Sequence, residues 1–283
     1  MFRILFVGDI VGRPGRRAVR EIIPVLREKH KIDFVIANGE NSAHGAGHTV
    51  KTTKEIFSSG VDAITSGDHL WDNNEVSELL KNEPRFFRPL NYPLGVEGSG
   101  AGYVTTPNGI KVGIINLQGR TFMKSLENPF HAGMEAAQRL RRETPIIFVD
   151  FHAEATAEKI SMGRYLDGHV SVVVGTHTHV QTADESIFPK GTAYLTDAGF
   201  TGPHEGVIGR EADDAIHRFL TSEVNRLEIG ARDLRLQGAM IDINETTGKA
   251  IKIQRISECV VSFEEQIRRA QEAAKSAAAK SGV

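Results

Sequence analysis

Short apolar runs rich in β-branched residues recur along the chain, and each is followed by an acid, an amide or a histidine. The runs span residues 4–7, 34–37, 63–65, 146–151, 170–174 and 194–196. The polar groups that follow them are Asp9, Glu40-Asn41, Asp68-His69, His152, His177-Thr178-His179 and Asp197. Such runs predict strands that are buried on both faces. Ligands of open α/β sheets bind beyond the carboxyl ends of strands, so these polar groups are predicted to share one rim.

Segments with helical spacing lie between the strand-like runs, at residues 16–30, 49–58, 73–80, 131–142 and 154–166. The alternation predicts an α/β layered fold. Two antiparallel hairpins are also expected. One joins 103–106 to 110–117 through Pro107-Asn108-Gly109, where Asn-Gly is a hairpin signal, and the other joins 233–244 to 249–257.

The chain shows no internal repeat and no long linker, so residues 1–283 are expected to form a single domain. Residues 263–283 are rich in Ala, Glu, Gln and Arg and are expected to form a surface helix, over 263–279, with a frayed end. Packing of that helix on a partner subunit is the alternative.

Composition excludes several classes of protein. The 283 residues are 40% hydrophobic and 25% charged, which is an ordinary globular composition. The net charge of −2 leaves no basic field for a long nucleic acid. The single cysteine, Cys259, excludes an intrachain disulfide and a thiolate metal cluster. We see no signal peptide and no membrane span of ~20 apolar residues, and therefore expect a cytoplasmic protein with no membrane partner.

The polar groups at the strand ends are weak signals one by one. The two imidazoles of His177-Thr178-His179 would project to the same side of an extended segment. His152 and Asp9 read equally well as hydrogen-bonded or capping groups. As a set they indicate metal, because crowded carboxylates resist ionisation and a pair of divalent cations relieves the repulsion. Imidazole and carboxylate ligands suit Fe, Mn or Zn.

The order of these motifs resembles the signature of the calcineurin-like metallophosphoesterases. A closer resemblance, to the bacterial YmdB-like branch, is carried by Gly8-Asp9-Ile10-Val11-Gly12, Ala37-Asn38-Gly39-Glu40-Asn41, Asn116-Leu117-Gln118-Gly119-Arg120-Thr121-Phe122-Met123 and Thr196-Asp197-Ala198-Gly199-Phe200-Thr201-Gly202-Pro203. The resemblance implies a four-layer fold, in which two mixed sheets pack together between helices. It also implies a homo-oligomer, a di-metal site of iron or manganese, and phosphodiesterase activity on cyclic nucleotides, notably 2′,3′-cyclic ones.

The resemblance assigns a role to each motif residue. One metal would be held by Asp9, Glu40, Asn41 and His179, and the other by Glu40, Asp68, His152 and His177. Glu40 would bridge the two ions. His69 matches the histidine that binds no metal and faces the substrate, where it would stabilise charge and protonate the leaving oxygen.

Two positions depart from the superfamily pattern. Val11 stands where many members have a histidine, and Asn41 would supply the missing ligand. Asp68 stands where the family usually has asparagine. The anionic ligands Asp9, Glu40 and Asp68 would leave a charge of +1 on two divalent ions, and asparagine would leave +2. We therefore hypothesise that Asp68 favours a trivalent ion such as Fe³⁺ in the second site, or slows turnover.

Residues near the ligands are candidate substrate contacts. Arg13 lies where a helix is expected to begin and would meet a phosphate there, or else it is a solvated surface group. Arg120 follows Gly119 in a loop that would cover the site. His44 and His48 lie near Glu40 and would contact substrate, or else they are exposed loop histidines.

Three further residues are assigned a role near the site. Trp71 would stack on a nucleobase or pack in the protein interior. Asp197 and His204 would orient the ligand histidines.

The leading functional hypothesis is a di-metal phosphodiesterase that acts on a small phosphodiester. A phosphomonoesterase with the same centre is the second hypothesis. A metal-binding regulatory protein with little turnover is the third, and the complete ligand set and His69 argue against it.

Overall fold

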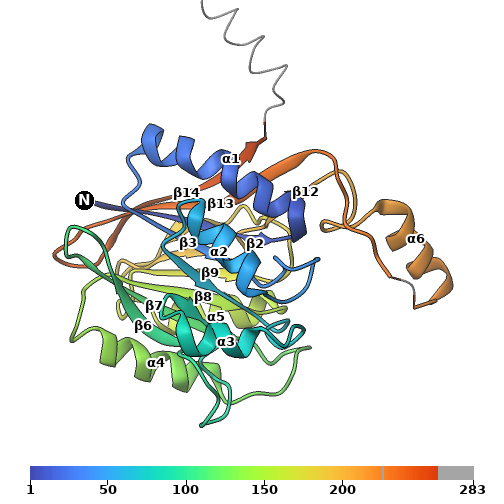
Figure 1. Cartoon of the computed structure of the whole chain (residues 1–283). Coiled ribbons are helices and arrows are strands. Elements are labelled where there is room, and N and C mark those ends of the chain that lie inside the picture. Colours follow the sequence, from blue (N-terminus) through green and yellow to red (C-terminus); the bar gives the residue numbers. More distant parts are fainter. Residues whose placement is uncertain (225, 261–283) are drawn as a thin grey trace, which may run out of the picture.

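The computed structural model describes residues 1–224 and 226–260 (Figure 1). The helix expected at 263–279 and the frayed end beyond it lie outside the described residues. Six helices are found in the described part: α1 (Gly12–His30), α2 (Val50–Ser58), α3 (Val76–Asn82), α4 (Pro129–Leu140), α5 (Thr156–Tyr165) and α6 (Ala212–Thr221). None of them is long and apolar enough to cross a bilayer.

The first sheet is mixed and contains both ends of the described chain. Its order is β2-β12-β13-β1-β3-β4-β5, and β14 also pairs with β13. The strands are β1 (Phe2–Val7), β2 (Asp9–Ile10), β3 (Phe34–Asn38), β4 (Ala63–Thr65), β5 (Phe86–Phe87), β12 (Phe200–Pro203), β13 (Leu234–Ile243) and β14 (Ala250–Cys259). Strands β1, β3, β4 and β5 run parallel, whereas β13 is antiparallel to β1.

The second sheet has the order β10-β11-β9-β8-β7-β6. Its strands are β6 (Ala101–Thr105), β7 (Lys111–Gln118), β8 (Ile147–His152), β9 (Val172–Thr176), β10 (Ser186–Ile187) and β11 (Ala193–Leu195). Strands β7, β8 and β9 are parallel, and Gln118 pairs with His152 and His152 with Thr176. The carboxyl ends of these strands therefore share one rim.

Three apolar clusters divide the molecule into four layers, as expected. The cluster between the sheets includes Phe6 and Phe148, whose ring centroids are 4.8 Å apart. A second cluster joins α1, α2 and α3 to the outer face of the first sheet. A third joins α4 and α5 to the outer face of the second. Figure 1 shows α1 and α4 on opposite sides of the sheets.

Local sequence explains how the helices begin and end. In α1 the buried Val19, Ile22 and Leu26 recur every three or four residues on one face, and Lys31 ends the helix in a left-handed conformation. Thr49 begins α2 with a reciprocal capping box with Thr52. Pro129 suits the first turn of α4, because its missing N–H needs no partner there.

The expected elements are present with shifted bounds, and one helix was missed. The helix expected from residue 16 begins at Gly12, and the one expected at 73–80 is α3, which starts at Val76. Both predicted hairpins form, as β6–β7 and β13–β14, but they are parts of the two mixed sheets rather than a separate region. Helix α6 was not predicted, and it projects away from the sheets (Figure 1).

The layered core generates a stability prediction. Phe148 is fully buried between the sheets, so Phe148→Ala is expected to lower the free energy of unfolding by about 3–5 kcal/mol through lost burial and a cavity. Phe219→Ala is the matched control, since that ring on α6 is 85% exposed and its loss is expected to cost less than about 0.5 kcal/mol. Urea titrations compare the two, and equal losses would contradict the four-layer core.

Candidate metal centre

Four side chains from four strand ends meet at the rim. They are Glu40 after β3, Asp68 after β4, His152 at the end of β8 and His177 after β9. One ligand atom from each lies within 4.8 Å of all the others, an arrangement that could hold a metal ion. His152 Nε2 is 3.1 Å from Glu40 Oε2, 3.0 Å from Asp68 Oδ1 and 3.0 Å from His177 Nδ1. These are the four residues expected to hold the second metal.

The remaining expected ligands surround the other oxygen of Glu40. The amide of Asn41 lies 3.1 Å from Glu40 Oε1 and 3.2 Å from His179 Nε2. Asp9 Oδ2 lies 3.9 Å from His179 Nε2 and accepts a hydrogen bond from the backbone N–H of His177 at 3.0 Å. Glu40 therefore stands between two groups of ligands, where a bridging carboxylate would stand.

The donor set fits a pair of cations. Asp9 and Glu40 are 0% and 1% exposed, and His152 lies 3.9 Å from Asp9 Oδ1 and 3.1 Å from Glu40 Oε2. Burial raises the pKa of Asp9 well above its ordinary value, because it outweighs the opposite effects of His152 and of the His177 N–H. Burial lowers the pKa of His152, but Glu40 and the neighbouring carboxylates outweigh this and raise that pKa well above its ordinary value. The site thus favours positive charge, and its nitrogen and oxygen donors suit Fe, Mn or Zn.

Each candidate histidine ligand is held by its second nitrogen. His152 Nδ1 lies 2.9 Å from Thr176 Oγ1, and His179 Nδ1 lies 3.1 Å from the carbonyl oxygen of Ile208. His177 Nε2 lies 3.2 Å from Glu154 Oε2. These contacts direct the opposite nitrogen of each ring into the cluster. Glu154 was not predicted as a site residue, because an acid just before α5 is typical of a helix start.

The backbone of the His177-Thr178-His179 segment is not extended, and that prediction was wrong. His177 and His179 have φ angles of 101° and 60°, which are unusual for residues with a side chain. Asp197 holds the segment in place, because its Oδ2 accepts hydrogen bonds from Thr178 Oγ1 at 2.8 Å and Thr178 N at 3.2 Å. The same oxygen pairs with the buried Lys159 at 2.6 Å. Asp197 is therefore placed to orient both histidines through the backbone.

A second buried acid, Asp150, stabilises the strand ends that carry the cluster. Its Oδ1 accepts from Thr176 Oγ1 at 2.7 Å, and its Oδ2 accepts from Thr65 Oγ1 at 2.5 Å and Asn38 Nδ2 at 3.0 Å. Asn38 Oδ1 in turn accepts from the backbone N–H of Glu40. One carboxylate thus ties β3, β4 and β9 to β8. This bridging role of Asp150 was not predicted from the sequence.

His69 lies at the edge of the cluster. Its Nδ1 is 2.8 Å from Asp72 Oδ2, and the side chain is 41% exposed. Burial lowers the pKa of His69, but the charges of Glu40, Asp72 and Asp68 outweigh it, so that the net pKa is raised. The imidazole is therefore fixed at one nitrogen, accessible, and suited to carry a proton.

The candidate substrate contacts are less well supported. Arg13, His44 and Arg120 are exposed, and in the described part of the chain no side-chain hydrogen bond or ion pair joins them to the cluster. His48 is fully buried, 2.9 Å from Ser66 Oγ, and burial lowers the pKa of His48 to about 3. Both interpretations of His48, as a substrate contact and as an exposed histidine, were wrong.

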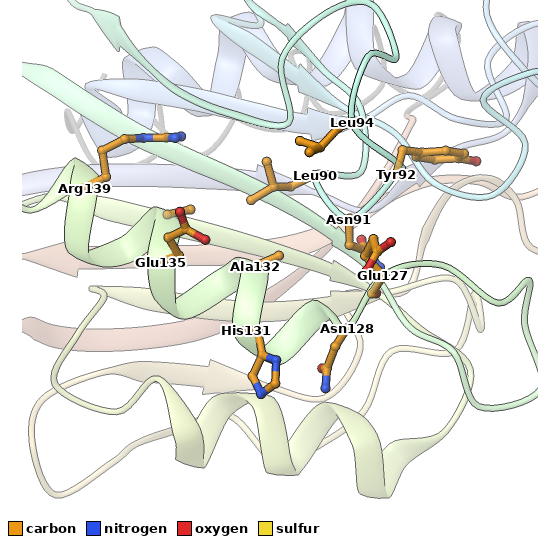
Figure 2. A pocket seen from close by; sticks show the side chains of 11 residues that line it. Leu90, Asn91, Tyr92, Leu94, Glu127, Asn128, His131, Ala132, Glu135 and Arg139 are labelled. Atoms are coloured by element: carbon orange, nitrogen blue, oxygen red, sulfur yellow. The ribbon is translucent and has the colours of Figure 1, made fainter.

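A cavity of about 470 Å³ lies away from these ligands. It lies between the loop at 90–94 and α4, and Figure 2 shows Leu90 and Leu94 facing Ala132 and Glu135 across it. None of the candidate metal ligands lines this cavity. This cavity is therefore not part of the candidate metal centre.

Two mixed sheets between helices, with a carboxylate–histidine cluster at one rim, define a metallophosphoesterase-related α/β protein. The chain belongs to the YmdB-like protein family, whose sequence profile matches residues 5–256. It is 50% identical, over 90% of this chain and 96% of the relative, to a 2′,3′-cyclic-nucleotide 2′-phosphodiesterase of Bacillus subtilis (strain 168).

Two crystal structures resemble the whole fold. A novel phosphatase from Mycoplasma pneumoniae matches with a TM-score of 0.85 and 32% identity, over 94% of this chain and 96% of its own. A hypothetical protein from Thermus thermophilus matches with a TM-score of 0.84 and 37% identity, over 92% and 100%. The overall fold of this chain therefore matches that of both crystal structures.

The charge of the cluster generates a prediction about Asp68. Replacing Asp68 with asparagine removes one anionic ligand and keeps its shape, so we expect a lower content of trivalent metal and a faster turnover. Elemental analysis with assignment of oxidation states, together with phosphodiesterase rates, measures both. Glu143→Gln is the control, because that exposed carboxylate pairs with Lys111 and touches no candidate ligand. Identical metal content and rate in Asp68→Asn and the wild type would remove the hypothesis.

Proposed function

We propose that the chain is a di-metal phosphodiesterase that hydrolyses small phosphodiesters, with 2′,3′-cyclic nucleotides as substrates. The observation that carries the proposal is the convergence of Glu40, Asp68, His152 and His177, from four strand ends, on a volume the size of a metal site. The name of the 50% identical relative supports the substrate class.

The metals are part of the proposal. Asp9, Asn41 and His179 would hold one ion, Asp68, His152 and His177 the other, and Glu40 both. When bound, two transition-metal ions lower the pKa of a water and neutralise charge on the phosphoryl oxygens. Iron or manganese is the proposed occupant, and zinc is the alternative that the same donors accept.

His69 is the proposed acid of the reaction. Hydrolysis adds a hydroxyl to phosphorus, breaks the P–O2′ bond and leaves a 3′-phosphate, so O2′ must gain a proton. Asp72 is hydrogen-bonded to Nδ1 of His69, so Nε2 is the ring nitrogen that would donate the proton to the substrate. Burial lowers the pKa of His69 and the carboxylates around it raise that pKa on balance, which favours the protonated imidazole. The remaining residues of the cluster position the phosphate and exclude bulk water.

The proposal concerns a small substrate and a single catalytic domain over residues 1–283. The net charge of −2 offers no extended surface for long nucleic acids. A cytoplasmic location belongs to the same proposal. Self-association does too.

A substrate panel tests the activity. The metal-loaded protein is expected to hydrolyse bis-p-nitrophenyl phosphate and 2′,3′-cAMP with a higher kcat/KM than p-nitrophenyl phosphate. Preference for the monoester would favour a phosphomonoesterase. A metal-replete protein that is inactive on all three compounds would favour the regulatory interpretation.

The His69→Ala variant tests the mechanism. It is expected to keep its metal and to lose turnover by about 10²–10⁴-fold, the usual contribution of a positioned acid. Metal content by elemental analysis and kcat on 2′,3′-cAMP are measured side by side. His131→Ala, an exposed histidine on α4, is the matched control and is expected to match the wild type. A variant that loses metal but keeps its activity per remaining ion would instead make His69 a ligand.

A further inference from the structure

Trp71 belongs to the same turn as Asp68 and His69. Leu70 is fully buried and anchors this turn in the first apolar cluster. The N–H of Asp72 donates to the carbonyl oxygen of His69 at 3.1 Å, and the two side chains pair at 2.8 Å. The turn is therefore held both by packing and by hydrogen bonds, and Trp71 follows the candidate acid at a distance of two residues.

The indole of Trp71 is fixed on one side and open on the other. Its ring stands edge-on to Tyr92, with centroids 6.1 Å apart and planes at 81°. Tyr92 is only 7% exposed, whereas Trp71 is 40% exposed. Burial raises the pKa of Tyr92, and its contact with Trp71 lowers that pKa, so the two side chains also interact through their polar groups. The exposed part of the indole therefore belongs to a fixed residue of the turn that carries Asp68 and His69.

An exposed but immobilised aromatic ring is a suitable platform for a base. Stacking is tolerant of base identity because every base has a π-face, and a preorganised ring loses little conformational entropy on binding. In a nucleoside 2′,3′-cyclic phosphate the base and the phosphodiester are attached to the same ribose. A group that binds the base must therefore lie close to the groups that act on phosphorus, and Trp71 is two residues from His69 in the same turn.

We propose that the exposed part of the Trp71 indole binds the nucleobase of the substrate and makes the enzyme selective for nucleoside phosphodiesters over base-free ones. This inference rests on the proposed phosphodiesterase function and names a residue that determines specificity at the same site. The rival platform is Phe122, which is 90% exposed and has a φ of 62° in the loop after β7.

Kinetics on two cyclic phosphodiesters test the proposal. For Trp71→Ala, the ratio of kcat/KM on 2′,3′-cAMP to kcat/KM on glycerol 1,2-cyclic phosphate is expected to fall about 5- to 100-fold, mainly through KM. Trp71→Tyr is expected to recover most of that ratio. Tyr103→Ala is the matched control, because Tyr103 is 43% exposed but pairs with Gly113 near the start of β7, away from the rim. An unchanged ratio in Trp71→Ala would overturn the proposal.

Fluorescence supplies a test that does not depend on turnover. Trp71 is the single tryptophan of the chain, so the intrinsic tryptophan emission reports its environment alone. Adenosine 3′-monophosphate is expected to quench this emission saturably in the metal-loaded protein, whereas ribose 5-phosphate is not. No quenching by the nucleotide, or quenching of equal strength by ribose 5-phosphate, would overturn the proposal.

The outcomes separate this inference from the proposed function. If the wild type hydrolyses neither cyclic phosphodiester, the proposed function fails, and the fluorescence titration still decides whether Trp71 binds a base. If the wild type is active but only Phe122→Ala lowers the ratio, the base binds at Phe122 and the assignment to Trp71 is wrong. Metal content and circular dichroism of each variant verify that it is folded.

Discussion

Burial of carboxylates is the constraint on which the structure depends. Four acids are essentially inaccessible at the junction of the two sheets, and they differ in how their charge is compensated. Asp197 pairs with Lys159, and Asp150 accepts hydrogen bonds from three side chains. Asp9 and Glu40 are equally buried, and the same imidazole, His152, lies 3.9 Å from Asp9 Oδ1 and 3.1 Å from Glu40 Oε2. Since two buried carboxylates that share one imidazole are incompletely compensated, the second pair marks where a cation belongs, and the first pair holds the surrounding chain in place.

The residues at the carboxyl ends of the strands could be predicted from the sequence, because the pattern that identifies them lies within a few neighbouring residues. A buried parallel strand reads as an apolar run, so the residue that follows it can be identified without knowing its neighbours, as for Glu40 and Asp68. The supporting contacts are different in kind. Asp150 acts through Asn38, Thr65 and Thr176, which are distant in sequence, and Glu154 meets His177 only after β8 and β9 have paired. Helix α6 was missed although Ile216, Phe219 and Leu220 have helical spacing; in the structure these side chains are exposed and the helix buries only Ala215.

The turn after β4 carries three residues with different proposed roles, Asp68, His69 and Trp71. It carries a candidate ligand, a candidate acid and the proposed platform for the base. A Cβ at Gly67 would lie 1.9 Å from Glu40 Oε2 and 2.3 Å from His152 Nε2, so only glycine lets the turn approach the cluster this closely. The three groups are therefore held by the same packing. A change in the position of Asp68 would also move the groups that act on the leaving oxygen and the base, and this links metal binding to substrate recognition.

The charge distribution favours recognition of the nucleoside over recognition of a polyanion. Lysine and arginine number 34 against 36 acids, so the surface supplies no net attraction for phosphates. Positive charge at the rim would come from the bound ions, and in salt of physiological strength its reach is limited to roughly 8 Å. A single phosphodiester group lies within this distance of the ions, and further phosphates along a nucleic-acid strand would add little binding energy. Selectivity among small phosphodiesters must then come from uncharged contacts beside the cluster, and a fixed aromatic ring supplies such a contact without weakening the hold on the phosphate.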